Sequence, residues 1–233
     1  YNMLCICLGT PPRSFSWQIR DKKKKFRRFN NLTPLDFYNK HVDIVLTDKL
    51  CLIHCPMSNK EMNEHYTVSF LGNVVGGHII SYANVEINIM KRAAAKSIKG
   101  GEAIWFGCDV GKMFHRDLGV MNMDLYDYEL LFDTKFTMDK KTKLEYGDSV
   151  MTHAMLITAV DLKGGQSLKW RIENSWGDKG GDKGYMLMTD DWFDEYTYEV
   201  VVDKKYLPQK VLGIFERDPV SLNPWDPMGS LAR

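Results

Sequence analysis

The sequence predicts an α+β fold in which helical segments precede a run of strands. Apolar residues recur at helical spacing before residue 101, most clearly in 87–98. From Glu102 onward, short apolar runs follow one another with no long helical pattern between them. Strands that succeed each other in this way are typical of an antiparallel sheet or half of a barrel. We therefore expect a hairpin and helical region at 1–101, a β domain at 102–220 and an extended arm at 221–233.

Two helices are expected in the first part. Thr33 can cap a helix, Pro34 suits the first helical position, and Asp36 favours the positive end of the helix dipole. The second helix is expected to begin with Asn84 as its cap and to end at Gly100-Gly101. Its apolar face consists of Ile87, Met90, Ala94 and Ile98.

Strand patterns account for most of the second part. The expected strands occupy 103–109, 149–160, 168–174, 184–189 and 199–203. Shorter strand patterns occur earlier, at 51–53 and 66–71. The end of the chain contains Pro224 and Pro227, which exclude a helix or a central strand, so an extended arm is expected there.

The N-terminal region combines two strand patterns with a basic run. Segments 3–8 and 15–20 are expected to be strands of a hairpin or an arm, separated by Pro11-Pro12. The basic run that follows comprises Lys22, Lys23, Lys24 and Lys25. Such a run is either a solvated turn between strands or, with Phe26 and Phe29 beside it, a patch for an anionic partner such as nucleic acid.

The composition is ordinary for a globular protein. Charged residues make up 26% of the chain and the net charge is +1, which gives no general attraction to nucleic acid or to a membrane. Apolar runs are far shorter than the roughly 20 residues that span a bilayer, and no signal peptide is recognised. The odd count of five cysteines indicates free thiols and a reducing, cytoplasmic compartment. Because the chain begins at Tyr1 within an apolar run, an internal start is expected.

The strongest functional signal is a histidine and an asparagine at the ends of two successive strands. His153 lies in Met151-Thr152-His153-Ala154-Met155, and Asn174 opens Asn174-Ser175-Trp176-Gly177, 21 residues further on. A hairpin through Gly164-Gly165 can place such strand ends side by side. The asparagine amide oxygen can then accept from one imidazole nitrogen and leave the other as a base for a thiol. The pattern predicts the base half of a thiol-protease site, with Trp176 shielding the pair.

These residues belong to a wider pattern that resembles the papain-like cysteine peptidases, and within them the C-terminal half of the bleomycin hydrolase family. The histidine strand and the Asn-Ser-Trp-Gly segment have the same order in papain-like enzymes. The closer resemblance rests on motifs along the whole chain, among them Thr33-Pro34-Leu35-Asp36-Phe37-Tyr38, Trp105-Phe106-Gly107-Cys108-Asp109-Val110-Gly111-Lys112 and Trp225-Asp226-Pro227-Met228-Gly229. The resemblance implies a papain-like fold whose β-barrel-like domain lies in this chain, whereas the helical domain with the nucleophile is absent from it.

The resemblance implies a cysteine-type aminopeptidase that hydrolyses N-terminal residues of peptides, and the amide of bleomycin. His153 would be the general base and later the general acid, Asn174 would orient it, and Trp176 would shield both. The nucleophile is expected in a Gly-Ser-Cys-Trp-like segment outside the chain, so the isolated chain is expected to be inactive. The alternative is a catalytically silent fragment that acts in oligomer assembly or in nucleic-acid binding.

None of the cysteines has the sequence context of a nucleophile. Cys5 and Cys7 precede His153 by 148 and 146 residues, which lies within the papain spacing of about 130–150. Their alternating pattern nevertheless predicts buried strand residues rather than the start of a helix. Cys108 is also expected to be buried in a strand. A metal cluster is not expected, and neither is a cofactor, because no second thiol pair accompanies Cys51, His54 and Cys55.

The resemblance also implies a role for the end of the chain. In bleomycin hydrolase-like proteins the last residues lie along the active-site cleft, and the terminal carboxylate pairs with the amine of the substrate. The matching residues here are Leu231, Ala232 and Arg233. A terminal arginine would repel an amine, so removal of Arg233 is a hypothesis. The family further implies a homohexamer, and weak nucleic-acid binding for which the lysine run is the candidate.

Overall fold

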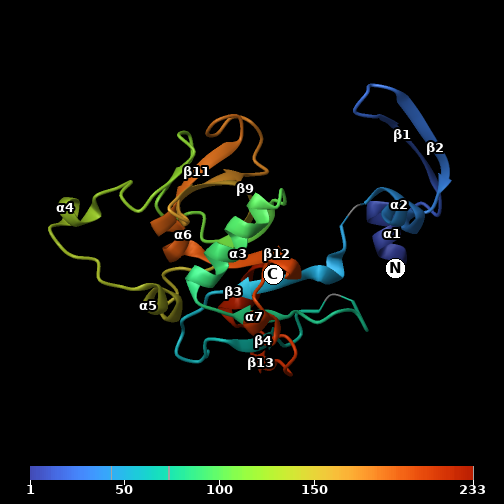
Figure 1. Cartoon of the computed structure of the whole chain (residues 1–233). Coiled ribbons are helices and arrows are strands. Elements are labelled where there is room, and N and C mark those ends of the chain that lie inside the picture. The colour runs from blue at the N-terminus through green and yellow to red at the C-terminus, as the bar shows by residue number, and fades with distance from the viewer. Residues whose placement is uncertain (43, 73, 233) are drawn as a thin grey trace. The chain divides into compact units, whose positions relative to one another are not determined.

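The computed structural model of the chain describes residues 1–42, 44–72 and 74–232, without the side chains of 230–232. The chain divides into two compact units, one from Tyr1 to Leu46 and one from Thr47 to the end (Figure 1). Each unit has its own secondary structure. No helix in the described part of the chain is long and apolar enough to span a membrane.

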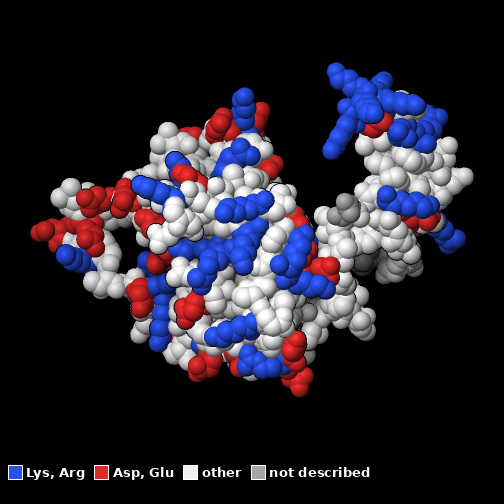
Figure 2. Space-filling model, viewed as in Figure 1, with Lys and Arg blue, Asp and Glu red and all other residues white. Residues whose placement is uncertain are grey.

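The first unit is built on a hairpin of β1 (Phe15–Arg20) and β2 (Phe26–Leu32). Its turn contains the basic run: the Asp21 carboxylate accepts the backbone N–H groups of Lys23 and Lys25, each at 3.0 Å. The run therefore lies in a turn between two strands, and binding of an anionic partner there stays a prediction. Figure 2 shows lysine and arginine side chains gathered around this hairpin.

Residues 2–8 form the helix α1 (Asn2–Leu8), so the prediction of a strand at 3–8 is wrong. β1 takes β2 as its neighbour, and no described strand pairs with residues 3–8. A segment without a neighbouring strand can satisfy its backbone hydrogen bonds within a helix. Most of the apolar side chains of α1 are exposed, and none of its residues is buried.

The helix α2 (Pro34–His41) begins as predicted. Thr33 Oγ1 accepts from the Asp36 N–H at 3.1 Å, and the Asp36 carboxylate accepts from the Thr33 N–H at 3.3 Å, which is a capping box. The helix packs on the hairpin through aromatic contacts. The ring centroids of Trp17 and Phe37 are 4.9 Å apart, in an edge-to-face arrangement.

The second unit contains one long sheet, preceded by the short 3-10 helix η1 (Leu46–Asp48). Its strands are β3 (Lys49–Ile53), β4 (Glu64–Val68), β5 (Tyr82–Asn84), β6 (Ile104–Cys108), β7 (Phe114–His115), β8 (Val120–Met121), β9 (His153–Lys163), β10 (Gln166–Glu173), β11 (Tyr185–Thr189), β12 (Thr197–Asp203) and β13 (Val220–Leu222). Among the described residues they lie in the order β13-β4-β5-β3-β12-β6-β9-β10-β11-β8-β7. Neighbours are antiparallel except for β3 with β5, β4 with β13 and β8 with β11.

All five strands expected between 103 and 203 are present, as β6, β9, β10, β11 and β12. The pattern at 51–53 lies within β3, whereas that at 66–71 overlaps β4 only in part. Because β3, β4 and β5 share the sheet with the later strands, the boundary expected near residue 101 runs through the second unit.

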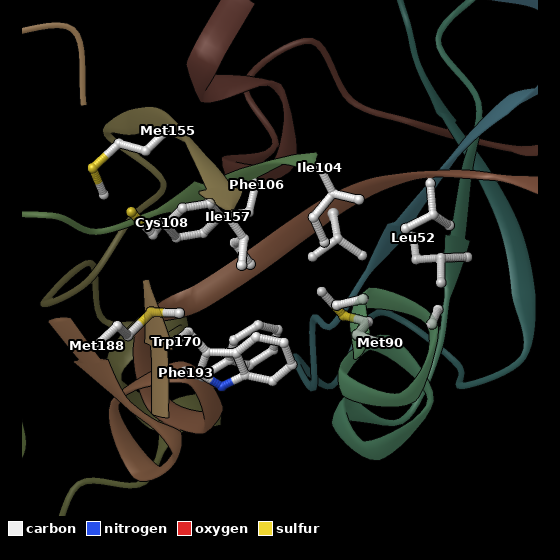
Figure 3. Close-up of a cluster of buried hydrophobic side chains, with 14 of the residues drawn as sticks. Leu52, Met90, Ile104, Phe106, Cys108, Met155, Ile157, Trp170, Met188 and Phe193 are labelled. Carbon is white, nitrogen blue, oxygen red and sulfur yellow. The ribbon is translucent and has the colours of Figure 1, made fainter. Parts of the chain in front are cut away.

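Two helices cover one face of this sheet, α3 (Ile87–Lys99) and α6 (Asp190–Tyr196). Figure 3 shows Met90 of α3 and Phe193 of α6 packed under strand residues such as Phe106 and Ile157. The rings of Phe193 and Trp170 stack with centroids 5.1 Å apart. These side chains form the main hydrophobic core, which holds the central strands in register.

The apolar face of α3 is confirmed, but its start differs from the prediction. Met90 and Ala94 are buried, and Gly100 is the C-terminal cap. The cap residue at the other end is Glu86, which makes no side-chain capping bond. Asn84 lies in β5, where its side chain accepts from the Cys55 N–H and donates to the Cys55 carbonyl, at 2.9 and 3.1 Å. Its amide therefore closes a buried loop instead of a helix end.

The end of the chain is less extended than predicted. After β13, residues Pro227–Ala232 form the 3-10 helix η3. Met228 is completely buried in a second hydrophobic cluster with Tyr82 and Met151, and Asp226 forms an ion pair with Lys60 at 2.7 Å. The expectation that proline excludes a helix here is wrong, because Pro227 occupies the first position of the helical turn, where its missing N–H costs nothing. The remaining short helices are α4 (Tyr128–Phe132), α5 (Lys140–Glu145), η2 (Lys204–Tyr206) and α7 (Gln209–Leu212).

Candidate active site

A tight hairpin brings His153 and Asn174 together. His153 is the first residue of β9, and Asn174 follows the last residue of β10. The two strands are joined by Gly164 and Gly165 alone, with φ of 59° and 86°. Two successive residues with positive φ suit the short turns whose twist matches paired strands, and glycine adopts that conformation without strain. The predicted hairpin is present and places the two side chains side by side.

The histidine and the asparagine form a hydrogen bond whose direction can be assigned. His153 Nε2 lies 3.0 Å from Asn174 Oδ1. The same Oδ1 accepts the backbone N–H of Ser175 at 2.8 Å, which identifies it as the oxygen of the amide. An oxygen can only accept, so the hydrogen lies on Nε2 and Nδ1 is the basic nitrogen. The geometry therefore selects one tautomer of His153 and leaves Nδ1 to receive a proton.

Trp176 lies over the imidazole, and its role as a shield of the pair stays a prediction. The ring centroids of Trp176 and His153 are 5.0 Å apart, with an angle of 32° between the planes. Trp176 itself is 39% exposed and is held from other directions by Phe114, with centroids 6.2 Å apart, and by the Arg116 guanidinium, 4.9 Å from its ring centre. Phe114 and Arg116 were not predicted from the sequence, because they lie on a separate two-residue strand and the turn after it, where no pattern relates them to Trp176.

The loop after Trp176 is held by the turn between β7 and β8. The Gly181 N–H donates to the Asp117 carbonyl at 3.2 Å. Gly181 has φ of 60°, and a Cβ there would lie 2.2 Å from the carbonyl oxygen of Tyr185. Only glycine fits this backbone without displacing it. Gly181, the second residue of the Gly180-Gly181 pair, thus allows the backbone conformation of the loop that follows Trp176.

A groove lies beside the His153–Asn174 pair, on the sheet face opposite the main core. The Phe106 side chain belongs to the core, whereas that of its neighbour Trp105 lines the groove, since side chains alternate along a strand. The groove has a volume of about 430 Å³. Its lining includes Trp105, Gly107, Ala154, Leu156, Asn174 and Glu199. Trp105 is 63% exposed, so a large apolar side chain stands uncovered next to the candidate site.

A carboxyl and a thiol form a pair at the groove. The Cys51 thiol donates to Glu199 Oε1 at 2.8 Å. Burial raises the pKa of the Glu199 carboxyl and raises that of the Cys51 thiol well above its usual value. Cys51 therefore stays protonated at neutral pH. His54, three residues further on, does not join this pair, because its Nδ1 is hydrogen-bonded to the Val85 carbonyl at 2.9 Å. In the described ranges, no group of three or more metal-binding side chains gathers around these residues.

The remaining cysteines occupy two kinds of environment. Cys108 is completely buried in β6, as predicted, and burial raises the pKa of its thiol well above the usual value. Cys5 and Cys7 lie on α1, where Cys5 is partly exposed and Cys7 is exposed. The expectation that they are buried strand residues is wrong, because α1 has no side chain packed into an interior. Neither lies in the first turn of α1, where the helix dipole would favour a thiolate.

The residues expected to recognise the substrate end lie at the limit of the described chain. Leu231 and Ala232 belong to η3 by their backbone, and their side chains are not described. Arg233 lies outside the described residues. Their role stays a prediction.

Comparison with known proteins shows the family. The model of the Peptidase C1-like family matches residues 1–229. The chain is 49% identical over 238 residues to bleomycin hydrolase of Homo sapiens and 45% identical over 233 residues to aminopeptidase C of Lactococcus lactis subsp. cremoris, covering 100% of the chain and 52% and 53% of those proteins. The solved structure of pepw from Lactobacillus rhamnosis HN001 matches with a TM-score of 0.94 at 44% identity, over 98% of this chain and 52% of that one.

The chain therefore belongs to the Peptidase C1-like family. The predicted resemblance to the bleomycin hydrolases and the predicted papain-like α+β fold are confirmed. The chain spans about half the length of the curated relatives it matches.

Proposed function

We propose that this chain supplies the base half of the active site of a cysteine aminopeptidase of the bleomycin hydrolase type. The observation that carries the proposal is the bond of 3.0 Å between His153 Nε2 and Asn174 Oδ1, with Trp176 over the imidazole. Membership of the Peptidase C1-like family supports it. The thiol would come from a segment outside this chain, and the isolated chain would be inactive.

The chemistry follows from the assigned tautomer. Asn174 keeps the hydrogen on Nε2, so Nδ1 of His153 can take the proton of a thiol placed next to it. The thiolate then attacks the carbonyl carbon of the first peptide bond. His153 returns the proton to the nitrogen of the leaving amine, which departs and leaves an acyl-enzyme. Water, deprotonated by Nδ1, hydrolyses the thioester and restores the thiol.

The groove on the open sheet face offers a place for the segment that carries the thiol. Gly107, which has no side chain, and Ala154, which has only a methyl group, form a pair in the register of β6 and β9. They leave space next to Asn174, and the exposed Trp105 provides apolar surface that a partner would cover. A segment bound there would bring its thiol toward His153, at the first residue of β9.

The C-terminal residues would recognise the N-terminal amine of the substrate. Met228 lies in the helical turn η3 that leads to these residues. It is buried in the same cluster as Met151, and Met151 lies two residues before His153. An anchor at that point supports a terminal carboxylate at the cleft, where it would pair with an ammonium group and limit cleavage to the first residue. Leu231, Ala232 and Arg233 would form this end, with Arg233 removed in the working form.

Three further properties belong to the proposal. The protein would act on peptides in the cytoplasm, which agrees with the five free cysteines. It would assemble as a homohexamer, for which the exposed side chains of Leu130, Leu131 and Phe132 on α4 provide apolar contact surface.

Weak nucleic-acid binding is a second candidate function, supported by the basic hairpin around Lys22–Lys25. Its test is retention on DNA at rising salt, since phosphate contacts weaken steeply as counterions compete.

The proposed function is tested with the polypeptide that contains both this chain and the thiol segment. A thiol-alkylating probe at neutral pH should label one cysteine fast, outside this chain, and aminopeptidase turnover should be lost with it. His153→Ala should abolish both the fast labelling and turnover, whereas Ser175→Ala, which keeps the backbone N–H that Asn174 accepts, should leave them near wild type. Labelling confined to Cys5, Cys7, Cys51, Cys55 or Cys108 would favour the silent fragment instead.

A further inference from the structure

A buried carboxylate lies next to the segment that leads into His153. Asp109 directly follows Cys108, which pairs in register with His153. Asp109 is only 5% exposed, although it carries a carboxyl group. The register of β6 and β9 therefore places Asp109 beside the residues just before His153, and the proposed mechanism does not use it.

Three donors from one short segment converge on the Asp109 carboxylate. The Ser149 hydroxyl donates to Oδ2 at 2.8 Å, the Val150 N–H donates to Oδ2 at 3.3 Å, and the Thr152 hydroxyl donates to Oδ1 at 3.3 Å. No ion pair joins Asp109 to a lysine or arginine of the described chain, so these neutral donors compensate its burial. Residues 149–152 are thus tied to Asp109 by both oxygens of its carboxylate.

Tyr198 supports this arrangement from the neighbouring strand. A bulge between Thr197 and Glu199 in the pairing of β12 with β6 changes the direction of the intervening side chain. The Tyr198 hydroxyl lies 2.5 Å from Ser149 Oγ. Ser149 has a single hydroxyl proton and gives it to Asp109, so Tyr198 donates to Ser149. Burial raises the pKa of the Tyr198 phenol, which keeps that donor protonated.

We propose that Asp109 is a positioning residue for the peptidase reaction, acting through the segment 149–152 on His153. The inference rests on the proposed function. The described side-chain hydrogen bond of His153 is made by Nε2, on the far side from the basic Nδ1. The position of Nδ1 therefore depends on the backbone at 152 and 153. The Thr152 N–H is held by the Cys108 carbonyl at 2.9 Å, and Asp109 restrains the same segment through the Thr152 hydroxyl and the Val150 N–H. A displacement of about 1 Å between reacting groups can lower a rate roughly 100-fold.

Asp109→Asn tests this role in the polypeptide that carries the thiol segment. The new amide nitrogen faces donors instead of accepting from them, so at least one bond to 149–152 is lost. We expect kcat to fall roughly 10-fold to 100-fold and KM for an aminoacyl anilide to change less than about 3-fold, because substrate binding is not the step affected. Thr152→Val, which removes a hydroxyl donor, should also lower kcat, whereas Thr152→Ser, which keeps it, should not.

Asp148→Asn is the matched control. Asp148 lies one residue before the segment, is exposed, and pairs with Lys112 at 3.2 Å, so its loss should leave kcat near wild type. Asp109→Asn combined with Thr152→Val should cost little more than the larger single effect, since both remove one interaction. A wild-type kcat in Asp109→Asn, or fully additive effects, would overturn the inference. If Asp109→Asn also lowers the unfolding midpoint, the comparison of kcat between Thr152→Val and Thr152→Ser decides whether the positioning role holds.

Different results would refute the proposed function and the positioning role of Asp109. A wild-type polypeptide without thiol-dependent turnover would refute the proposed function, and the positioning role with it. A fully active wild type whose Asp109 and Thr152 variants keep the same kcat would refute the positioning role alone.

Discussion

The ion pair between Lys60 and Asp226 anchors the C-terminal segment, and its removal is the sharpest test of the packing described above. Lys60 Nζ and Asp226 Oδ2 are 2.7 Å apart, and the two side chains are 0% and 5% exposed. Lys60 also donates to Asn59 Oδ1 at 3.1 Å, and Asp226 accepts from the Met228 N–H at 3.0 Å. Asp226→Ala would leave a buried ammonium group without its carboxylate and would free the turn that places Met228.

The expected magnitude follows from this burial. Removing one partner of a buried ion pair costs about 3–5 kcal/mol, because the remaining charge stays desolvated without compensation. At about 2–4 °C per kcal/mol for a unit of this size, the unfolding midpoint should fall by roughly 6–20 °C. Replacing both partners with apolar side chains, as in Lys60→Met with Asp226→Leu, should recover most of the loss, since no buried charge remains.

Thermal and urea unfolding followed by circular dichroism measure these differences. Lys112→Met is the control, because the Lys112 and Asp148 side chains are 34% and 45% exposed and an exposed pair contributes less than about 1 kcal/mol. The stabilising role of the ion pair is refuted if Asp226→Ala and Lys60→Met each shift the midpoint no more than the control does.

Three further predictions concern other parts of the second unit. Burial, with the nearby Lys140 charge, lowers the pKa of His54 from 6.5 to about 4, so the unfolded chain takes up a proton in this window that the folded chain does not. The free energy of unfolding should therefore decrease as pH falls from 6.5 to about 4, and urea midpoints should show a shallower pH dependence in His54→Gln. Gly181→Ala should destabilise the fold by more than about 1 kcal/mol in urea unfolding, because its Cβ would meet the Tyr185 carbonyl, whereas Gly164→Ala, with the same sign of φ but open space, should cost less. Asn174→Ala should lower kcat of the active polypeptide roughly 10-fold to 100-fold with a smaller change in KM, and an unchanged kcat would show that the histidine needs no orienting partner.

The local signals of the sequence were reliable where short-range physics decides the structure. The cap at Thr33 with Pro34 and Asp36 defines the start of α2, as expected, because capping bonds join residues three positions apart. The Gly164-Gly165 pair marks the hairpin, and the strand patterns on both sides of it are present as β9 and β10. Those elements alone bring His153 to Asn174, so this part of the candidate site was predictable.

The errors occurred where the outcome depends on distant neighbours. Residues 3–8 alternate like a strand but form a helix, since no strand among the described residues pairs with them. Asn84 is a residue type that often caps helices, yet its side chain binds the backbone of Cys55, which lies far from it in the sequence. The helical turn at Pro227 depends on the pair of Asp226 with Lys60, 166 residues away. None of these partners is visible in a local window.

The sequence by itself determined the family, the α+β class and the histidine and asparagine of the candidate site, because these follow from motifs and from one hairpin. Only the tertiary structure decided which imidazole nitrogen is the base, since that depends on the oxygen of Asn174 accepting from both Ser175 and His153. It also decided that Phe114 and Arg116 hold Trp176 and that Asp109 binds the segment before His153. These contacts join strands and turns that are distant along the chain, and the sheet order that makes them neighbours is a property of the whole folded unit.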